Sequence, residues 1–325
     1  MKNLKNIGLV VLATLALTSC SKDDNNQNLL PSASEFGAVR QIAIDNRIQH
    51  FTMTAEAGIA TFTSTNGVAI TLNGNGLRKN GNPVTGVVNI DYIELFNRGN
   101  MLVTNKPTMG VLPNGDKNLL ISGGEFMIKA TQGGVELTTV TAIDLVIPAD
   151  LTGGIDDAMV LWTGNTDDVE NLTWNQQNPA GATGPQAGNI GFEQNAYNIS
   201  FGNFGWTNVD RFYSDPRPKT TLLSSIPTGY SSSNCAVYLS YDGEGTNALA
   251  KLDTYNPVTK KFSEHYGQIP IGLQCHVIFV TEEAGQWRYA IKAVTVAAGD
   301  DYVFTLGETT LVSEAQLVAA INALP

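Results

Sequence analysis

The chain has few of the side chains that build common catalytic and metal sites. Among its 325 residues are three cysteines and three histidines, and only 15% of the residues are charged. His50, His265 and His276 lie in different segments without zinc-ligand spacing, which argues against zinc-dependent hydrolysis. The sequence also lacks a glycine-x-serine-x-glycine elbow, a phosphate loop and a dinucleotide fingerprint. These absences disfavour the commonest hydrolase and nucleotide-binding classes.

Positive charge is scarce as well. The chain carries 19 lysines and arginines against 30 aspartates and glutamates, which gives a formal net charge of −11. The basic residues form no cluster, so neither nucleic acid nor anionic lipid headgroups are expected as main ligands. The apolar run at residues 7–17 is too short to span a bilayer comfortably.

The most specific pattern lies at the N-terminus. Lys2 and Lys5 precede the apolar run, and small residues then lead to Cys20, an order typical of a secretory signal. The end of this segment, Leu-Thr-Ser-Cys, resembles the lipobox of bacterial lipoproteins, in which the cysteine is acylated, for example with palmitate. This resemblance implies a lipoprotein signal peptide at residues 1–19 and lipidation of Cys20. The alternative is a plain signal peptide that happens to contain a cysteine.

Residues 20–36 are expected to form a flexible tether. The run at 21–28 is polar throughout and cannot bury apolar surface to offset the entropy of ordering. Ser21, rather than an aspartate, follows the cysteine, which suggests delivery to the outer membrane. Lys22, Asp23 and Asp24 resemble the export tag of Bacteroidota surface lipoproteins, and an ordinary hydrophilic linker is the alternative. We therefore expect a protein anchored in the outer membrane by lipid and facing the cell exterior.

Residues 37–150 have the pattern of many short strands. Apolar and polar residues alternate in short segments, and turns rich in glycine and asparagine separate these segments. Asn66-Gly67, inside residues 59–72, is a strong hairpin signal. No segment here carries a long helical period, so we predict an antiparallel β-sandwich.

This region resembles the ZU-type β-sandwich domain, in the divergent form found in Bacteroidota lipoproteins. The residues that carry the resemblance are 84–88, Glu94-Leu95, Met101-Leu102, Pro107-Thr108, 119–124, 126–130 and Gly134-Val135. The asparagine-rich segment after Gly67 departs from the family pattern. Because such domains mostly serve as interaction or spacer modules, the resemblance implies no catalytic residues.

Residues 151–189 are predicted to be a loop-rich linker, because acidic residues there alternate with glycine and asparagine. Residues 190–325 again show strand patterns and predict a second β-sandwich. Within them, the segment Gly-Trp-Thr-Asn-Val-Asp-Arg-Phe at 205–212 resembles a signature of the same class of lipoproteins. Asp210-Arg211 is expected to form a structural ion pair or turn there.

The chain is predicted to end in a short helix. Ser313 and Gln316 fit a capping box. The apolar residues that follow fall on one helical face, namely Leu317, Val318, Ile321 and Leu324. The predicted fold class is therefore all-β, with two antiparallel β-sandwich domains and a short C-terminal helix.

The cysteines after Cys20 leave two alternatives open. Cys235 and Cys275 lie in strand-like runs of one predicted domain and could form a disulfide in an exported protein, or remain buried free thiols. Cys275 and His276 are neighbours on a strand, where adjacent side chains point to opposite faces. A cysteine–histidine nucleophile pair is therefore not expected.

Acidic loops suggest two kinds of site. Calcium prefers hard oxygen ligands in loops, and the candidates for such a site are Asp242 and Glu244, then Asp156-Asp157 and Asp167-Asp168. A pair of carboxylates for glycoside hydrolysis could come from Glu193, Asp210, Asp215 and Asp242. Solvated or loop-capping carboxylates are the favoured alternative.

Loop tyrosines suggest a binding surface. Candidates with polar neighbours are Tyr213, Tyr230, Tyr255 and Tyr266. Exposed aromatic residues in loops contribute contact area at low entropy cost, whereas small hydrophobic plugs under the long loops are the favoured alternative. We expect a non-catalytic binding or scaffold module with no required cofactor, whose partner is an outer-membrane protein complex or an extracellular protein or glycan. A carbohydrate-binding or glycan-active subunit is the alternative function.

Overall fold

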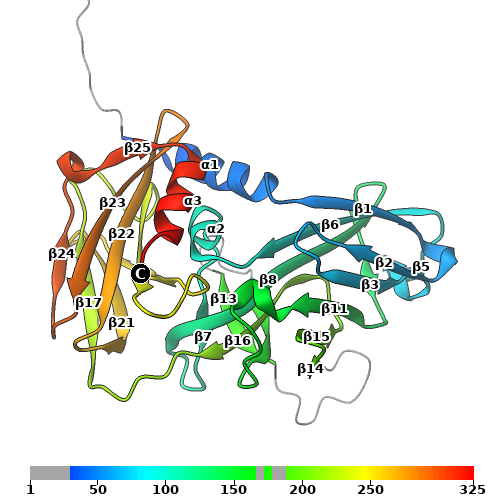
Figure 1. Ribbon diagram of the computed structural model, residues 1–325. Coiled ribbons are helices and arrows are strands. Elements are labelled where there is room, and N and C mark those ends of the chain that lie inside the picture. Colours follow the sequence, from blue (N-terminus) through cyan, green and yellow to red (C-terminus); the bar gives the residue numbers. More distant parts are fainter. Residues whose placement is uncertain (1–29, 166–171, 178–187) are drawn as a thin grey trace, which may run out of the picture.

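The computed structural model describes residues 30–165, 172–177 and 188–325 (Figure 1). Within these residues the fold is mostly β-strand with three short α-helices, which confirms the predicted all-β class with a short C-terminal helix. No helix of this part of the chain has the length and apolarity needed to cross a membrane. The predicted signal peptide, Cys20 and the tether up to residue 29 lie outside the described residues.

One part of the molecule, here called the N-terminal sandwich, contains a large sheet of order β1-β6-β8-β16-β12-β13-β7, with β9 paired to β8. Its strands are β1 (Gln49–Thr54), β6 (Val87–Leu95), β7 (Met109–Val111), β8 (Lys117–Gln132), β9 (Val135–Glu136), β12 (Val160–Asn165), β13 (Thr173–Gln176) and β16 (Gly205–Phe212). The pairing is antiparallel except between β13 and β7.

A second sheet of the N-terminal sandwich has the order β14-β15-β11-β3-β2, and a small third sheet has the order β10-β4-β5. The strands are β2 (Ile59–Thr63), β3 (Ala69–Asn73), β4 (Leu77–Lys79), β5 (Asn82–Pro83), β10 (Thr138–Thr139), β11 (Ile143–Pro148), β14 (Asn189–Glu193) and β15 (Ala196–Phe201). Alternate residues of β11 are buried. They join residues of the large sheet, such as Ile128, in one core.

The C-terminal sandwich has sheets of order β20-β21-β17-β24 and β19-β18-β22-β23-β25. Their strands are β17 (Lys219–Ser225), β18 (Cys235–Tyr241), β19 (Ala250–Lys251), β20 (Thr254–Asn256), β21 (Lys261–Pro270), β22 (Gln274–Glu283), β23 (Gln286–Thr295), β24 (Asp301–Val303) and β25 (Thr310–Val312). β22 is buried on both faces: Val277 and Phe279 face the sandwich core, whereas Ile278 and Val280 belong to a second cluster.

That second cluster joins the two sandwiches. The helices α1 (Ala33–Asp45), α2 (Arg98–Val103) and α3 (Glu314–Asn322) lie between the sandwiches in Figure 1, and short 3-10 helices occur at η1 (Ala55–Ala57), η2 (Gly74–Gly76), η3 (Ala149–Thr152) and η4 (Leu306–Glu308). Phe36, Leu102 and Leu317 of the helices pack with Leu95 of β6 and Ile278 of β22. The junction is therefore an apolar core.

The predicted linker at 151–189 is wrong where the structure describes it. β12 and β13 are strands of the large sheet, and β14 to β16 also belong to the N-terminal sandwich, which therefore extends to Phe212. Leu161, Trp162 and Trp174 are buried there although their sequence neighbours are polar. β12 pairs with β16, and β13 pairs with β12 and β7, so both short strands depend on partners that the local sequence does not reveal.

The tether prediction is wrong from Ser32 onward, because α1 begins there. Ser32 and Glu35 form a capping box, and Phe36, Val39 and Ala43 follow at helical spacing on the buried face. The view that residues 36–150 contain no helix is also wrong, since α1 and α2 both lie partly or wholly in that range. α2 has only six residues, which is too short to form without its packing partners.

The predicted hairpin and C-terminal helix are both confirmed. β2 pairs with β3 through the turn that contains Gly67, whose φ is +86°. Ser313 and Gln316 form the predicted capping box of α3, and Leu317 and Ile321 are fully buried. Arg98 donates from Nε to the carbonyl oxygen of Ile321 at 3.0 Å, which satisfies a backbone acceptor at the end of α3.

Candidate functional site

Of the two alternatives for the later cysteines, the structure shows the buried free thiols and not the disulfide. Cys235 and Cys275 are free, buried thiols on the paired strands β18 and β22. Cys235 stands opposite Thr281, whereas Cys275 stands opposite Tyr241 at the other end of the ladder. At about 3.4 Å per residue along a strand, that separation far exceeds the reach of a disulfide. Burial raises the pKa of Cys275 to about 12, so its thiol stays protonated at neutral pH.

The predicted tyrosine surface is wrong for two of its members. Tyr213 and Tyr230 belong to the core, with 8% and 6% of their surfaces exposed. Tyr213 packs edge-on against Tyr241, and its hydroxyl donates to Asp215. A local run of polar neighbours did not reveal these tertiary contacts.

Tyr255 and Tyr266 are only partly buried, but both are held by neighbours. Tyr255 packs on Phe262, with ring centroids 5.0 Å apart. The Tyr266 hydroxyl donates to Oδ2 of Asp253 at 2.9 Å. The Tyr255 hydroxyl also donates to the backbone carbonyl oxygen of Tyr230 at 3.4 Å. Because the Tyr213 and Tyr230 side chains are buried, the four tyrosines do not form one exposed platform.

Two of the candidate carboxylates, Asp215 and Asp242, contact basic side chains. Nδ1 of His276 lies 2.7 Å from Oδ1 of Asp242, and Arg217 donates to both oxygens of Asp215. The hydrogen bonds from Arg217 hold the pKa of the Asp215 carboxyl well below its usual range. The part of the chain that the structure describes contains no group of three or more histidine, cysteine, aspartate or glutamate residues arranged to hold a metal. Asp167-Asp168 lies outside that part.

Arg211 does not pair with Asp210 as predicted. Its Nε donates instead to Asp156 at 2.5 Å, on the side of β16 opposite to Asp210. The hydrogen bond from Arg211 helps to lower the pKa of Asp156 although burial opposes this. Asp210 is fully buried. The alternation of a strand separates the two neighbouring side chains.

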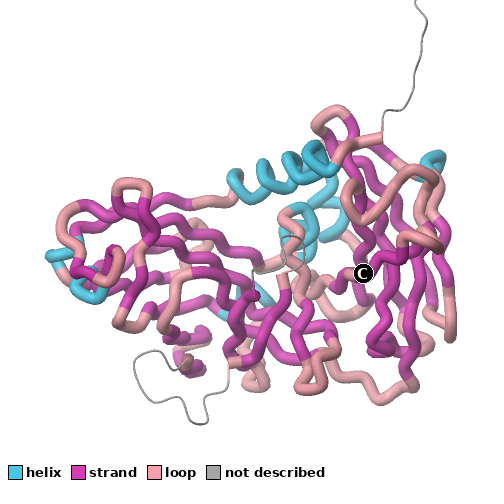
Figure 2. Tube along the Cα trace, turned by 180° about the vertical axis from the view of Figure 1, so that it is seen from behind, coloured by secondary structure: helices cyan, strands magenta, loops and turns pink. Residues whose placement is uncertain are grey.

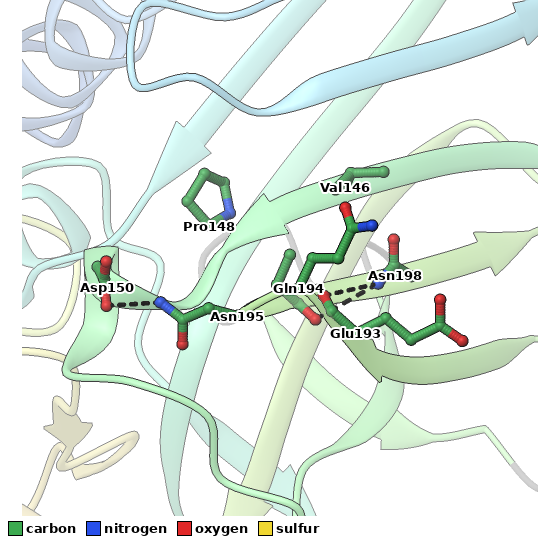
Figure 3. A pocket seen from close by; sticks show the side chains of 8 residues that line it. Val146, Pro148, Asp150, Glu193, Gln194, Asn195 and Asn198 are labelled. Carbon is green, nitrogen blue, oxygen red and sulfur yellow. Dashed lines mark hydrogen bonds between the residues drawn. The ribbon is translucent and has the colours of Figure 1, made fainter.

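Glu193 lines an open polar hollow at the β14–β15 turn (Figure 3). The cavity volume is about 400 Å³. Gln194 and Asn195 have φ values of 55° and 56°, which two-residue hairpin turns of this kind require. Asn195 Nδ2 donates to Asp150 Oδ1 at 2.8 Å across one side of the hollow. The polar groups that line the hollow are amides and carboxylates at the hairpin, and none of its lining residues is aromatic.

A second candidate lies where β16 begins, and we call it the Trp206 hollow. It consists of two adjoining depressions that share Phe204 and Trp206. The larger, of about 370 Å³, is lined by apolar groups of β8 and by Lys129 and Glu136. The smaller, of about 120 Å³, is lined by polar groups, namely Thr163, Gln177, Asn203 and Thr207, besides the backbone of Gly202.

Local backbone geometry orients the two aromatic side chains. Gly205 has a φ of +119°, a conformation that L side chains rarely adopt, so the chain turns sharply between Phe204 and Trp206. The Trp206 ring meets Trp174 edge-on at a centroid distance of 6.4 Å. Lys106 Nζ lies 5.3 Å from the Trp206 centroid, within the range of a cation–π contact. The ring is thus held in place while part of it stays exposed.

The sequence patterns did not predict this hollow, although the segment 205–212, which contains Trp206, resembles a lipoprotein signature. The useful signal is the glycine between two aromatic residues at the start of a strand. Its polar partners come from β12, from Gln177 and from Asn203, and only the folded sheet brings them together.

Comparisons with protein-family models, with curated proteins and with solved structures found no match. The resemblance of the first half to ZU-type domains, and that of segment 205–212 to a lipoprotein signature, therefore stay predictions.

Proposed function

We propose that this protein is a non-catalytic binding module, anchored by lipid to the outer membrane and displayed at the cell surface as an accessory subunit of an outer-membrane assembly. The observation that carries the proposal is the N-terminal sequence, in which a lipobox-like segment ends at Cys20 and a polar run follows. The first helix is capped at Ser32, so only a short segment separates the proposed anchor from the folded protein.

Replacement of the proposed lipid acceptor tests the anchor. In Cys20→Ala, acyl chains that contribute about 0.8 kcal/mol per buried methylene are lost. We expect the variant to leave the membrane fraction, measured by immunoblotting of separated membranes and soluble fractions. Ser21→Ala, which keeps the cysteine, serves as the control and should stay with the membrane. A Cys20→Ala protein that remains membrane-bound would contradict the anchor.

The Trp206 hollow is the surface that we assign to binding. It combines exposed aromatic area with polar side chains at its rim, a composition common in recognition sites. It lies on β8, β12 and β16, the paired strands of the large sheet, so the scaffold beneath it is rigid. A partner would find the groups already positioned, which lowers the entropy cost of association.

One observation favours a glycan as the alternative partner. Thr163, Gln177 and Asn203 line the smaller depression together with Phe204 and Trp206. Gln177 Nε2 donates to Thr163 Oγ1 at 2.6 Å, which orients both groups. Neutral hydroxyl-rich ligands use amides and hydroxyls for hydrogen bonds and an aromatic ring for apolar contact. No charged group lines this depression among the described residues.

Affinity electrophoresis through gels that contain neutral polysaccharides tests this alternative. If a glycan binds in the hollow, Asn203→Ala and Trp206→Ala should each weaken binding by about fivefold or more, since one hydrogen bond or aromatic contact contributes about 1 kcal/mol. Asn203 is exposed, so its variant should fold even if Trp206→Ala does not. Phe192→Ala, an exposed aromatic that lines neither depression, is the control. The glycan alternative would be wrong if the polysaccharide slowed the wild type and all variants equally. It would also be wrong if the polysaccharide did not slow the wild type.

A further inference from the structure

A group of buried oxygen atoms lies between β8 and β16, beneath the surface that the Trp206 hollow occupies. Glu125, Asn208 and Asp210 are all fully buried, with 0% of each residue exposed. Glu125 stands opposite Asn208 in the sheet register, and Ser122 stands opposite Asp210. Residues opposite each other in a sheet project to the same face. The four side chains therefore share one side of the sheet.

A β-bulge makes this arrangement possible. Asn208 and Asp210 are two residues apart, whereas their partners Glu125 and Ser122 are three apart, so β8 holds one extra residue. The bulge contains Gly124, whose φ is +128°. A Cβ atom on Gly123 would lie 2.9 Å from the carbonyl oxygen of Val209. Both glycines are thus required for the register that brings the oxygen-bearing side chains together.

Four of the oxygen atoms lack a hydrogen-bond donor. Among the residues that the structure describes, no group donates to Oε1 or Oε2 of Glu125, Oδ1 of Asn208 or Oδ1 of Asp210. Asn208 Nδ2 donates to Oδ2 of Asp210 at 2.7 Å, which fixes the orientation of the amide. A flipped Asn208 would place two acceptors against each other. Its Oδ1 is therefore a buried acceptor that needs a donor or a cation.

Two carboxyl groups, Glu125 and Asp210, lie in this fully buried group. Lys106 is a cation whose charge acts on Glu125. If both carboxyls were protonated, two of the four oxygen atoms would become donors to the other two. A bound cation is the arrangement that satisfies all four oxygen atoms while the carboxyls stay ionised.

We propose that Glu125, Asn208 and Asp210 form a buried structural site for a calcium ion. Calcium accepts six to eight oxygen ligands in flexible geometry, whereas magnesium demands a strict octahedron and retains several waters. A set of carboxylate and amide oxygens on one face of the sheet suits calcium better, because the coordination of calcium is flexible. The Ser122 hydroxyl oxygen, which accepts from the Gly124 amide at 3.0 Å, is a further oxygen on the same face.

The position of the site suggests its role. The backbone nitrogen of Ser122 donates to the carbonyl oxygen of Asn247, and Asn247 Nδ2 donates back to the carbonyl oxygen of Ser122 at 2.6 Å. Asn247 lies three residues before the start of β19 of the C-terminal sandwich. An ion beside Ser122 would therefore brace the junction between the sandwiches. This site is separate from Asp242 and Glu244, the loop residues for which the sequence suggested calcium.

The test uses the whole mature chain, stripped of metal with a chelator. Calcium binding is measured by titration calorimetry and by the thermal unfolding midpoint with and without calcium. We expect calcium to raise the midpoint of the wild type. Glu125→Gln should lose at least about tenfold in calcium affinity because a charged ligand becomes neutral. Asp144→Asn, at an exposed carboxylate of β11, should bind calcium as the wild type does.

A second readout needs no variant. Terbium replaces calcium at oxygen sites, and Trp162 stands opposite Asn208 in the sheet. Excitation of tryptophan should therefore sensitise terbium emission from the wild type, and calcium should quench it by displacement. Calcium binding that Glu125→Gln leaves unchanged would overturn the proposal. The proposal would also be overturned if the wild type gave neither heat on calcium addition nor sensitised terbium emission. In that case protons, and not a calcium ion, would neutralise the carboxyl groups.

Discussion

At the scale of single residues, Glu264 shows how burial and backbone contacts set the state of one carboxyl group. Glu264 is 2% exposed and lies where the β17–β21 register is interrupted. Its oxygens accept from the backbone amides of Tyr266, Gly267 and Gln268 at 3.1, 3.3 and 3.4 Å. Burial nevertheless dominates these hydrogen bonds and raises the pKa of Glu264 from 4.5 to about 7. The folded protein therefore holds this proton more tightly than the unfolded chain.

This difference predicts a pH dependence of stability. Because the folded-state pKa is the higher one, the contribution of Glu264 is fully present below pH 4.5 and is lost as pH rises through about 7. The loss amounts to at most about 3 kcal/mol. Denaturant unfolding between pH 5 and 8 should show a smaller decline for Glu264→Gln, which resembles the protonated form, than for the wild type. Glu136→Gln is the control. Parallel curves for wild type and Glu264→Gln would show that this carboxyl is ionised throughout.

Single residues also mark the limit of sequence reasoning about the site. Tyr213 and Tyr230 have polar neighbours in sequence and yet lie in the core, because burial depends on strands far away in the chain. The same holds for Asp210, whose buried partner in the sheet, Ser122, precedes it by 88 positions in the sequence. Candidate residue types could be recognised from the sequence, whereas their contacts could not.

At the scale of elements, the predictable parts are those with local signals. α3 carries its own capping box and apolar spacing, and the β2–β3 hairpin carries Asn66-Gly67. β12 and β13 lack such signals and are stabilised by pairing within the large sheet. α2 depends on α3, since Gly99 donates its backbone N–H to Asn322 Oδ1 at 2.8 Å. Elements that need a distant partner to form were the ones missed.

At the scale of the whole molecule, the two sandwiches are joined through helices and a shared core. Figure 2 shows, from the opposite side, helices packed between two strand-rich parts. Phe36 of α1 packs edge-on against Trp287 of β23, and Arg47 beyond α1 forms an ion pair with Glu314 of α3 at 2.7 Å. The class of fold and the C-terminal helix followed from sequence patterns. The boundary between the sandwiches did not, because strands up to Phe212 return to the first sheets.

The central claim is that this molecule binds a partner at the membrane through the Trp206 hollow. The most direct test is a mild-detergent pull-down of the tagged full chain from its native membrane, followed by mass spectrometry of the proteins that co-purify. The account predicts a stoichiometric outer-membrane protein with the wild type and with Phe192→Ala, and its loss with Asn203→Ala and Trp206→Ala. The account would be contradicted if no other protein co-purified with the wild type. It would also be contradicted if the same proteins co-purified with the wild type and with every variant.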